Sequence, residues 1–171
     1  MPELPEVEIV VRRLDAAISG AEVESALAPG MVTMKTVQPP LDSVAGRVVT
    51  GVRRLGKMPV VDFGDLSLLV HLMSAGRLQL FDERASLRDR RSRLLIRLAD
   101  GRELRLREFG TQQRAWAKLL TPGDLAADEQ QWQDCTVLAF PIGLGLQELV
   151  NGWEIYRAEL TALNQPQRRR R

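Results

Sequence analysis

The first residues of the chain carry two groups that together can perform covalent chemistry on an aldehyde carbon. A Met followed by a small residue is normally removed, so we expect Pro2 to become the N-terminal residue, with a free secondary amine. Because the pKa of an α-amino group is about 8, a useful neutral fraction of this amine exists at physiological pH and can act as a nucleophile. Glu3 can serve as the acid or base that iminium chemistry requires. Taken alone, the same two residues are also an ordinary helix start, since Pro and acidic residues are favoured in first turns.

Other candidate reactive residues are few. Lys57 offers a second amine in a predicted hairpin turn, where a lysine is usually a solvated surface residue. The chain has one histidine, His71, and one cysteine, Cys135, which excludes a His-rich metal site, a multi-cysteine zinc site and an internal disulfide framework. His71, between two apolar residues, fits a structural role as well as a ligand-binding role. We expect no metal and no cofactor.

Charge is unevenly distributed along the 171 residues, although the net charge is only +2. Residues 47–120 hold sixteen basic and eight acidic side chains, a balance of +8, whereas residues 1–46 and 121–171 are both net acidic. An arginine-rich segment of this kind is a candidate phosphate-binding surface. The alternative is that these arginines solvate strand edges and pair with neighbouring acids.

The pattern of apolar residues predicts the elements that must position these groups. Helical spacing from Val7 to Ile18 predicts a helix that begins near Pro5 and ends before Gly20. Short apolar runs between turn signals then predict eight strands, at 22–27, 47–54, 58–63, 66–71, 76–81, 93–98, 102–107 and 113–119. Asp100-Gly101 predicts a hairpin between the sixth and seventh of these strands. The seventh alternates apolar and charged residues, which indicates one buried and one polar face.

These elements predict an α+β, mainly β fold: an N-terminal helix followed by an antiparallel two-layer β-sandwich. Residues 82–92 read as an exposed, charged loop, and the tail beyond residue 120 as irregular or weakly helical. No apolar run approaches the roughly 20 residues of a membrane span. No basic-then-apolar leader opens the chain, so we expect a cytoplasmic protein without a membrane contact.

Four segments carry a resemblance to a known family. Met1-Pro2-Glu3-Leu4-Pro5-Glu6-Val7-Glu8 resembles the N-terminal signature of the formamidopyrimidine-DNA glycosylase/endonuclease VIII family. Three more segments resemble its motifs, in its order and at its spacing: Arg54-Leu55-Gly56-Lys57, His71-Leu72-Met73-Ser74-Ala75-Gly76-Arg77-Leu78 and Arg107-Glu108-Phe109-Gly110. The resemblance covers about residues 1–120, which we predict to be a glycosylase-like N-terminal catalytic domain.

The resemblance implies a role for each matching residue. In this family, the residue corresponding to Pro2 attacks the sugar C1′ and forms a Schiff base as an oxidised base leaves, while the one corresponding to Glu3 protonates the ring oxygen. Lys57 matches the lysine that contacts a phosphate and assists strand cleavage. The implied function is a DNA repair glycosylase with abasic-site lyase activity, acting as a monomer on damaged double-stranded DNA.

Three other matches imply DNA contacts. His71 corresponds to a position near the backbone of the damaged nucleotide. Arg107 matches the residue that meets the orphaned base, and Phe109 matches the wedge that enters the stack after base flipping. On its own, Phe109 could equally be a core aromatic, although its place beside Gly110 in a polar loop favours exposure.

The sequence departs from the family pattern in three respects. The family's intercalating Met is expected at Ser74, and Met73 stands one place early. Either a one-residue difference in the turn keeps Met73 as the DNA-binding wedge residue, or the filling of the void left by the flipped base is weakened. Glu108 replaces an arginine next to Arg107 and removes one positive charge. Residues 121–171 show neither a recognisable helix–two-turn–helix nor the four cysteines of the zinc finger that family members often carry, so we interpret the chain as a truncated member. The alternative function is therefore a non-catalytic DNA-binding remnant, and the excised base is left open.

Overall fold

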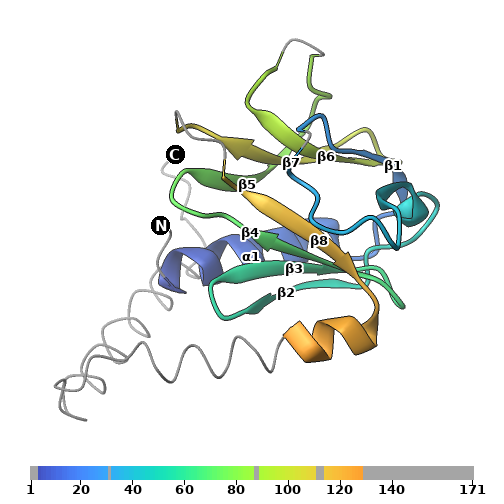
Figure 1. Ribbon diagram of the computed structural model, residues 1–171. Helices are drawn as coiled ribbons and strands as arrows, with labels where there is room; N and C mark the ends of the chain where they lie inside the picture. The colour runs from blue at the N-terminus through green and yellow to red at the C-terminus, as the bar shows by residue number, and fades with distance from the viewer. Residues whose placement is uncertain (1–3, 31, 87–88, 111–113, 129–171) are drawn as a thin grey trace, which may run out of the picture. The chain divides into compact units, whose positions relative to one another are not determined.

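The computed structural model describes residues 4–30, 32–86, 89–110 and 114–128 (Figure 1). Pro2, Glu3 and the tail beyond residue 128 lie outside the described residues, and what the sequence predicts for them stays a prediction. No helix in the described part of the chain is long and apolar enough to cross a membrane.

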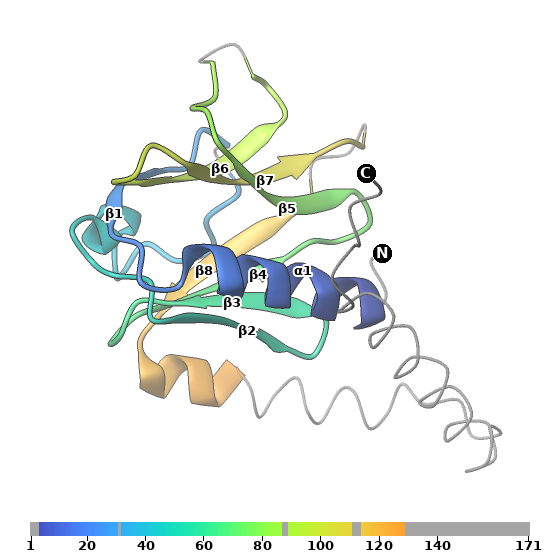
Figure 2. The same ribbon diagram turned by 180° about the vertical axis from the view of Figure 1, so that it is seen from behind.

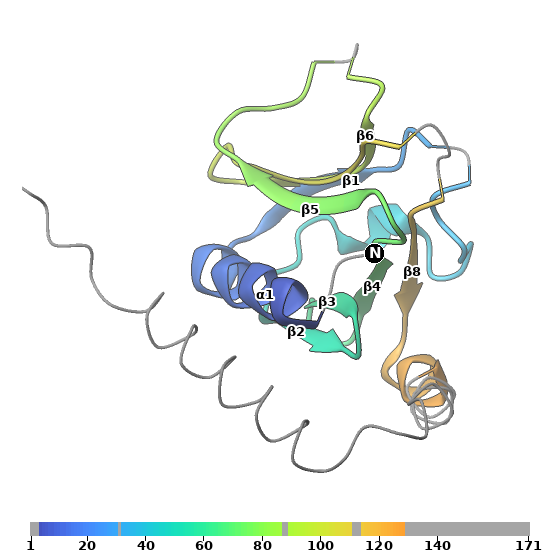
Figure 3. The same cartoon turned by 90° about the vertical axis from the view of Figure 1, so that its left-hand side faces the viewer.

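The N-terminal helix α1 (Leu4–Ile18) confirms the helix predicted from the apolar spacing. Four residues at three- and four-residue intervals form its buried face: Val7, Val11, Leu14 and Ile18. The helix contacts β2 of one sheet and β5 of the other, and it therefore lies along one side of the sandwich, between the two sheets (Figures 2 and 3).

Eight strands form the two antiparallel sheets that the sequence predicts. One sheet has the order β1-β6-β7-β5 and the other the order β2-β3-β4-β8. The strands are β1 (Val23–Leu27), β2 (Gly51–Leu55), β3 (Met58–Asp62), β4 (Ser67–His71), β5 (Gly76–Phe81), β6 (Ser92–Leu98), β7 (Glu103–Glu108) and β8 (Trp116–Leu120). The fold class is thus confirmed.

Several details differ from the prediction. The second strand begins at Gly51 rather than at residue 47, because Val48 makes only an isolated bridge with Glu22 before the ladder with β3 starts. A short 3-10 helix, η1 (Leu41–Val44), was not predicted. It follows two prolines, and the Ser43 hydroxyl donates a hydrogen bond to the Pro40 carbonyl (2.6 Å).

The main core fills the space between the sheets and α1, where buried aliphatic side chains from both sheets meet. A second, smaller apolar cluster lies on the other face of the β2-β3-β4-β8 sheet and includes Val60 and Leu69. Leu125, from the helical residues 122–128, packs in this second cluster. The domain boundary predicted after residue 120 falls between β8 and this helical segment, and it stays a prediction.

The polar face of β7 is the place where the structure departs most from the expectation. Glu103 has no exposed surface and Arg105 is 8% exposed, because Glu83 and Ala85, in the charged segment that follows β5, lie against them. Glu103 accepts hydrogen bonds from the Ala85 N–H (2.8 Å), Arg105 Nε (2.7 Å) and Arg97 Nε (3.0 Å). The alternation of charge along β7 therefore marks a buried ion cluster (Arg97, Glu103, Arg105), in which both arginines pair with the carboxylate of Glu103.

The β3–β4 hairpin turns at Gly64, with Asp62 opposite Ser67 and the Phe63 N–H donating to the Leu66 carbonyl (2.8 Å). Gly64 has φ +87° and is exposed, and a side-chain carbon at this position would meet nothing within 4 Å. This turn lies at the opposite end of the hairpin from His71.

Candidate functional site

Strand register places Lys57 and His71 at the same end of one sheet. Val60 of β3 lies opposite Leu69 of β4, so the start of β3, directly after Lys57, is level with His71 at the end of β4. Lys57 is half-buried in the tight turn between β2 and β3. The sheet thus gathers two predicted site residues that are fourteen positions apart in the sequence.

The second sheet brings the remaining motifs to this end. Gly76, which follows the turn after His71, lies opposite Glu108 of β7. The Phe109 N–H also donates to the Ala75 carbonyl (3.2 Å). We call this end of the sandwich the motif end, defined by Lys57, His71, Met73, Arg107 and Phe109.

Helix α1 starts at the motif end as well. Glu8 accepts hydrogen bonds from Arg54 Nε and from Arg12 Nε, and Asp15 accepts one from the Val52 N–H (2.7 Å). Because later helix residues meet earlier strand residues, α1 runs antiparallel to β2, and its N-terminus lies at the end where β2 turns into Lys57. The described part of the chain therefore begins at the same end of the sheet as the Lys57 turn.

The contacts of Glu8 keep it ionised. The hydrogen bond from Arg54 lowers its pKa most, burial raises it, and the contact with Arg12 lowers it further, so that the net pKa lies below the ordinary value. The pKa of Asp15 is also lowered, chiefly by the hydrogen bond from the Val52 N–H. Two carboxylates thus fix the helix to the strand that carries the Lys57 turn.

His71 is held as a neutral ring. Its Nδ1 accepts a hydrogen bond from the Met73 N–H (3.0 Å), and its ring stacks on Trp116 of β8, with centroids 5.1 Å apart and planes at 21°. Burial lowers the pKa of His71 below 6.5. A neutral imidazole that accepts at Nδ1 carries its proton on Nε2, and it can donate one hydrogen bond from there.

The turn after His71 is tightly constrained. The Gly76 N–H donates to the Leu72 carbonyl (2.8 Å), and a side-chain carbon on Gly76 would lie only 2.4 Å from that oxygen. Only glycine fits there. Met73 has the left-handed φ of +49° and is half-buried, while Ser74 is exposed. Which of the two takes the wedge position stays a prediction.

Phe109 is 50% exposed, in line with the exposure that the polar loop favours and not with a core position. The Arg107 guanidinium lies 5.1 Å from the centre of its ring. Arg107 itself is mostly buried, and its Nε lies 3.6 Å from an Asp89 oxygen without a hydrogen bond. An exposed aromatic ring beside an arginine is a surface that can stack on bases and meet phosphate.

Glu108 does not present its charge to the surface. It is 4% exposed, and its Oε1 accepts hydrogen bonds from the Arg114 N–H (2.6 Å) and the Ala115 N–H (3.0 Å). The acid that replaces a family arginine therefore holds the start of β8 beside the end of β7.

Sequence reasoning missed three residues at this end: Glu8, Arg91 and Trp116. Only strand pairing reveals the Trp116–His71 stack, because the two residues are 45 positions apart. Trp116 also packs against the second apolar cluster, so in the sequence it looks like an ordinary core aromatic. Within the described ranges, no three His, Cys, Asp or Glu side chains are arranged to hold a metal ion.

Comparison with known proteins identifies the family of this chain. Residues 1–112 match the model of the formamidopyrimidine-DNA glycosylase N-terminal domain. A formamidopyrimidine-DNA glycosylase of Listeria monocytogenes is 30% identical over 118 residues, which are 66% of this chain and 43% of the relative. One from an Acidovorax species is 41% identical over 83 residues, 46% of this chain and 29% of the relative. This chain therefore spans less than half the length of these relatives.

Comparison with solved structures identifies the same family. The crystal structure of the Lactococcus lactis glycosylase bound non-covalently to DNA containing an AP site superposes with a TM-score of 0.65 at 26% identity. The match covers 76% of this chain and 49% of the other.

Proposed function

Since the chain belongs to the formamidopyrimidine-DNA glycosylase family through its N-terminal domain, we propose that it excises oxidised bases from double-stranded DNA and cleaves the resulting abasic site. One observation carries the proposal: strand register gathers all the described motif segments, and the start of α1, at the motif end. The crystal structure of the Lactococcus lactis glycosylase holds AP-site DNA, which supports DNA as the partner.

The proposed reaction begins at the N-terminal amine. The neutral Pro2 nitrogen attacks the sugar C1′ as the bond from C1′ to the base breaks. The base leaves with the electron pair of that bond and takes up the proton that the Pro2 nitrogen gives up. Glu3 protonates the ring oxygen as the sugar opens, so that the nitrogen and C1′ form an iminium ion. The iminium makes the C2′ proton acidic, and its loss expels the 3′ phosphate. A second elimination then expels the 5′ phosphate.

The motif end supports these steps by binding the DNA backbone. Lys57 contacts a phosphate near the reacting sugar, and the Nε2–H of neutral His71 donates a hydrogen bond to the same strand. Phe109 enters the stack where the damaged nucleotide is flipped out, with Arg107 against the orphaned base and Met73 beside it. Flipping costs a few kcal/mol, which the inserted side chains partly offset.

DNA binding without chemistry is the second candidate function. It needs the exposed Phe109, its neighbour Arg107 and the basic segment 47–120, but neither Pro2 nor Glu3. The two functions therefore differ in whether a covalent intermediate forms.

Borohydride trapping tests the proposal. Incubation of the chain with an abasic-site duplex and borohydride should reduce the iminium to a stable protein–DNA adduct. Tryptic mapping should place the DNA on the peptide of residues 2–12, because Lys57 is the rival amine and lies in another peptide. An adduct on Lys57 would contradict the role of Pro2. Duplex binding with no adduct would favour the second function.

A further inference from the structure

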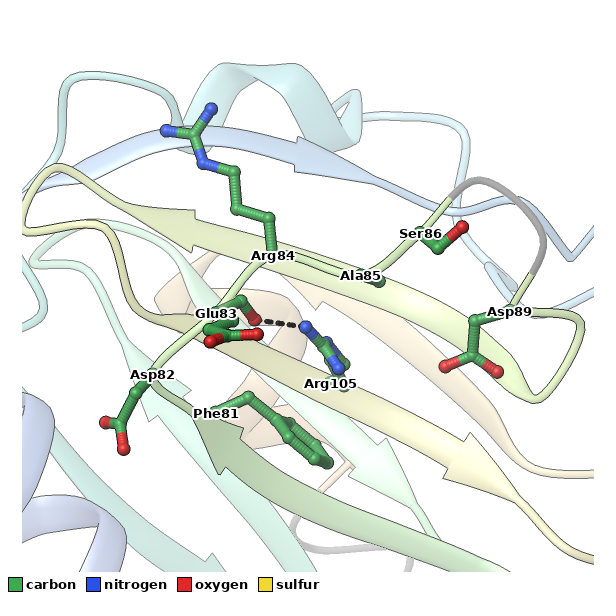
Figure 4. A pocket seen from close by; sticks show the side chains of 8 residues that line it. All are labelled: Phe81, Asp82, Glu83, Arg84, Ala85, Ser86, Asp89 and Arg105. Atoms are coloured by element: carbon green, nitrogen blue, oxygen red, sulfur yellow. Dashed lines mark hydrogen bonds between the residues drawn. The ribbon is translucent and has the colours of Figure 1, made fainter.

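Arginine and phenylalanine side chains alternate along the outer face of β5 and β7, from a surface pocket to the motif end. The pocket is lined by residues of the 82–92 loop, and in it Arg105 lies against Phe81 and donates a hydrogen bond to the Glu83 carbonyl (Figure 4). The Arg105 guanidinium is 4.1 Å from the Phe81 ring centre, and Arg107 is 5.5 Å from it. Each distance lies within the range of about 6 Å at which a cation is attracted to an aromatic face.

The row ends at the exposed ring of Phe109, which has two cationic neighbours. Arg107 lies 5.1 Å and Arg91 5.4 Å from its centre. Arg107 belongs to a motif segment, whereas Arg91 belongs to the 82–92 loop and to no motif. The exposed Arg91 side chain therefore adds a positive charge at the motif end that the family motifs do not account for.

The backbone of Arg91 is held on both sides. Its carbonyl accepts a hydrogen bond from the Glu108 N–H (3.0 Å), and its N–H donates to Asp89 Oδ1 (3.1 Å). The first bond joins Arg91 to the residue directly before Phe109. The stacking of Arg91 on Phe109 thus starts from a backbone already placed by the sheet.

Asp89 is the acidic group of this region. Burial raises its pKa, but hydrogen bonds from the Ser92 hydroxyl and the Arg91 N–H, together with the charges of Arg107 and Arg105, lower it by more, so that the net pKa lies below the ordinary value. Its carboxylate faces Ser92 and Arg107, at 2.8 and 3.6 Å. Of the two arginines beside Phe109, Arg107 is therefore the one whose guanidinium faces the charge of Asp89.

We propose that Arg91 is a further DNA-binding residue, which stacks on Phe109 and presents its charge to a backbone phosphate beside the inserted ring. The proposal rests on the proposed DNA-binding function. A guanidinium suits both tasks at once, because its flat face stacks on an aromatic ring while its edge donates hydrogen bonds to phosphate oxygens. An ammonium group keeps the charge but lacks the flat face.

Salt-titrated binding of the full chain to a duplex with a tetrahydrofuran abasic analogue tests this. Each neutralised phosphate contributes about −0.9 to the slope of log K against log salt concentration. Arg91→Gln should therefore make the slope shallower by about 0.9 and weaken binding several-fold at low salt. Arg91→Lys should keep the slope of the parent chain but reduce the fluorescence change of a 2-aminopurine placed beside the abasic position, because Phe109 stacks less well.

Arg84→Gln is the matched control. Arg84 lies in the same loop and pairs with Glu24, outside the row of stacked side chains, so its slope should equal that of the parent chain. Arg91→Gln with the slope and affinity of the parent chain would overturn the assignment of Arg91 alone. A parent chain whose duplex binding is absent or independent of salt would overturn the proposed function as well. Thermal unfolding should be unchanged in all three variants, since the substituted side chains are exposed.

Discussion

The two ends of β7 differ in how completely the protein itself bonds their arginine side chains. At its start, Glu103 is fully buried and its two oxygens meet Arg97, Arg105 and a backbone N–H. At its end, the Arg107 Nε is buried without a hydrogen bond and the neighbouring Phe109 is half exposed. The ionic groups at the start of β7 are saturated within the protein, whereas the exposed Phe109 ring, just after the other end, is left for a partner.

We infer that the start of the six-residue strand β7 contributes to stability and that its end contributes to binding. A buried ion cluster in which each charge is paired is costly to break but offers nothing to a ligand. An exposed ring beside incompletely bonded arginine contributes little to folding, and it can gain much on binding. Substitutions at the two ends should therefore separate stability from DNA binding.

The largest effect is expected at the saturated end. Glu103→Ala leaves two arginines facing each other in the covered site without their carboxylate, and we expect the free energy of unfolding to fall by about 3–5 kcal/mol. Urea unfolding followed by tryptophan fluorescence measures it. Glu24→Ala, which breaks the exposed pair with Arg84, should cost no more than about 1 kcal/mol. Equal losses in the two variants would refute the contrast.

Glu108 lies at the binding end of β7 but is itself buried and hydrogen-bonded. Its removal should therefore lower the free energy of unfolding by less than the removal of Glu103. Glu108→Ala deprives the Arg114 and Ala115 N–H groups of their acceptor, at an expected cost of about 1–3 kcal/mol in unfolding free energy. Glu108→Gln keeps an oxygen in place and should restore most of that loss in the same urea experiment. If Ala and Gln behave alike, the two hydrogen bonds do not contribute to stability.

At the end of β7 that precedes Phe109, a substitution should affect DNA binding more than stability. Phe109→Ala should change the unfolding free energy by no more than about 0.5 kcal/mol. It should weaken binding to an abasic duplex by about 1–3 kcal/mol, the value of one base–aromatic stack. Val37→Ala, at an apolar side chain that is 83% exposed, is the control for both measurements. A Phe109 variant that unfolds easily but binds normally would assign the ring to the core.

The smallest expected effect is a titration. His71 is the single histidine, so its ring protons give one resolvable NMR signal, and the midpoint should lie below 6.5 because burial disfavours the charged ring and lowers its pKa. Because the pKa of His71 is lower in the folded chain, the unfolded chain takes up a proton more readily. The free energy of unfolding should therefore fall slightly as pH drops below 6.5. Trp116→Ala exposes the ring and should move the midpoint up. A midpoint at or above 6.5 in the parent chain would contradict this.

Much of the fold follows from local pattern. The spacing from Val7 to Ile18 and the turn signal Asp100-Gly101 identify the helix and one hairpin, because each depends on neighbours within a few positions. The covered charges of β7 do not follow, because Ala85 meets Glu103 only after the 82–92 loop folds back across the strand.

For the candidate site too, local sequence predicts single residues but not how they come together. Resemblance of short segments identifies Lys57, His71, Arg107 and Phe109 one at a time. That they share one end of the sandwich depends on register between strands far apart in the chain, such as Gly76 opposite Glu108. Arg91 has no motif around it, and only its distance to Phe109 distinguishes it from the other loop arginines.

The exposed turn at Gly64 is a suitable attachment site for single-molecule and surface-based experiments. It lies about 15 Å from His71, the length of a five-residue strand, and on the far side of the hairpin from every residue of the motif end. Because Gly64 is exposed and a side-chain carbon there would meet nothing within 4 Å, a short peptide tag with a cysteine for a dye can be inserted after it, in a Cys135→Ser chain so that the tag holds the single thiol. The chain could then be immobilised without attaching anything to the N-terminal amine, and with the motif end facing away from the support.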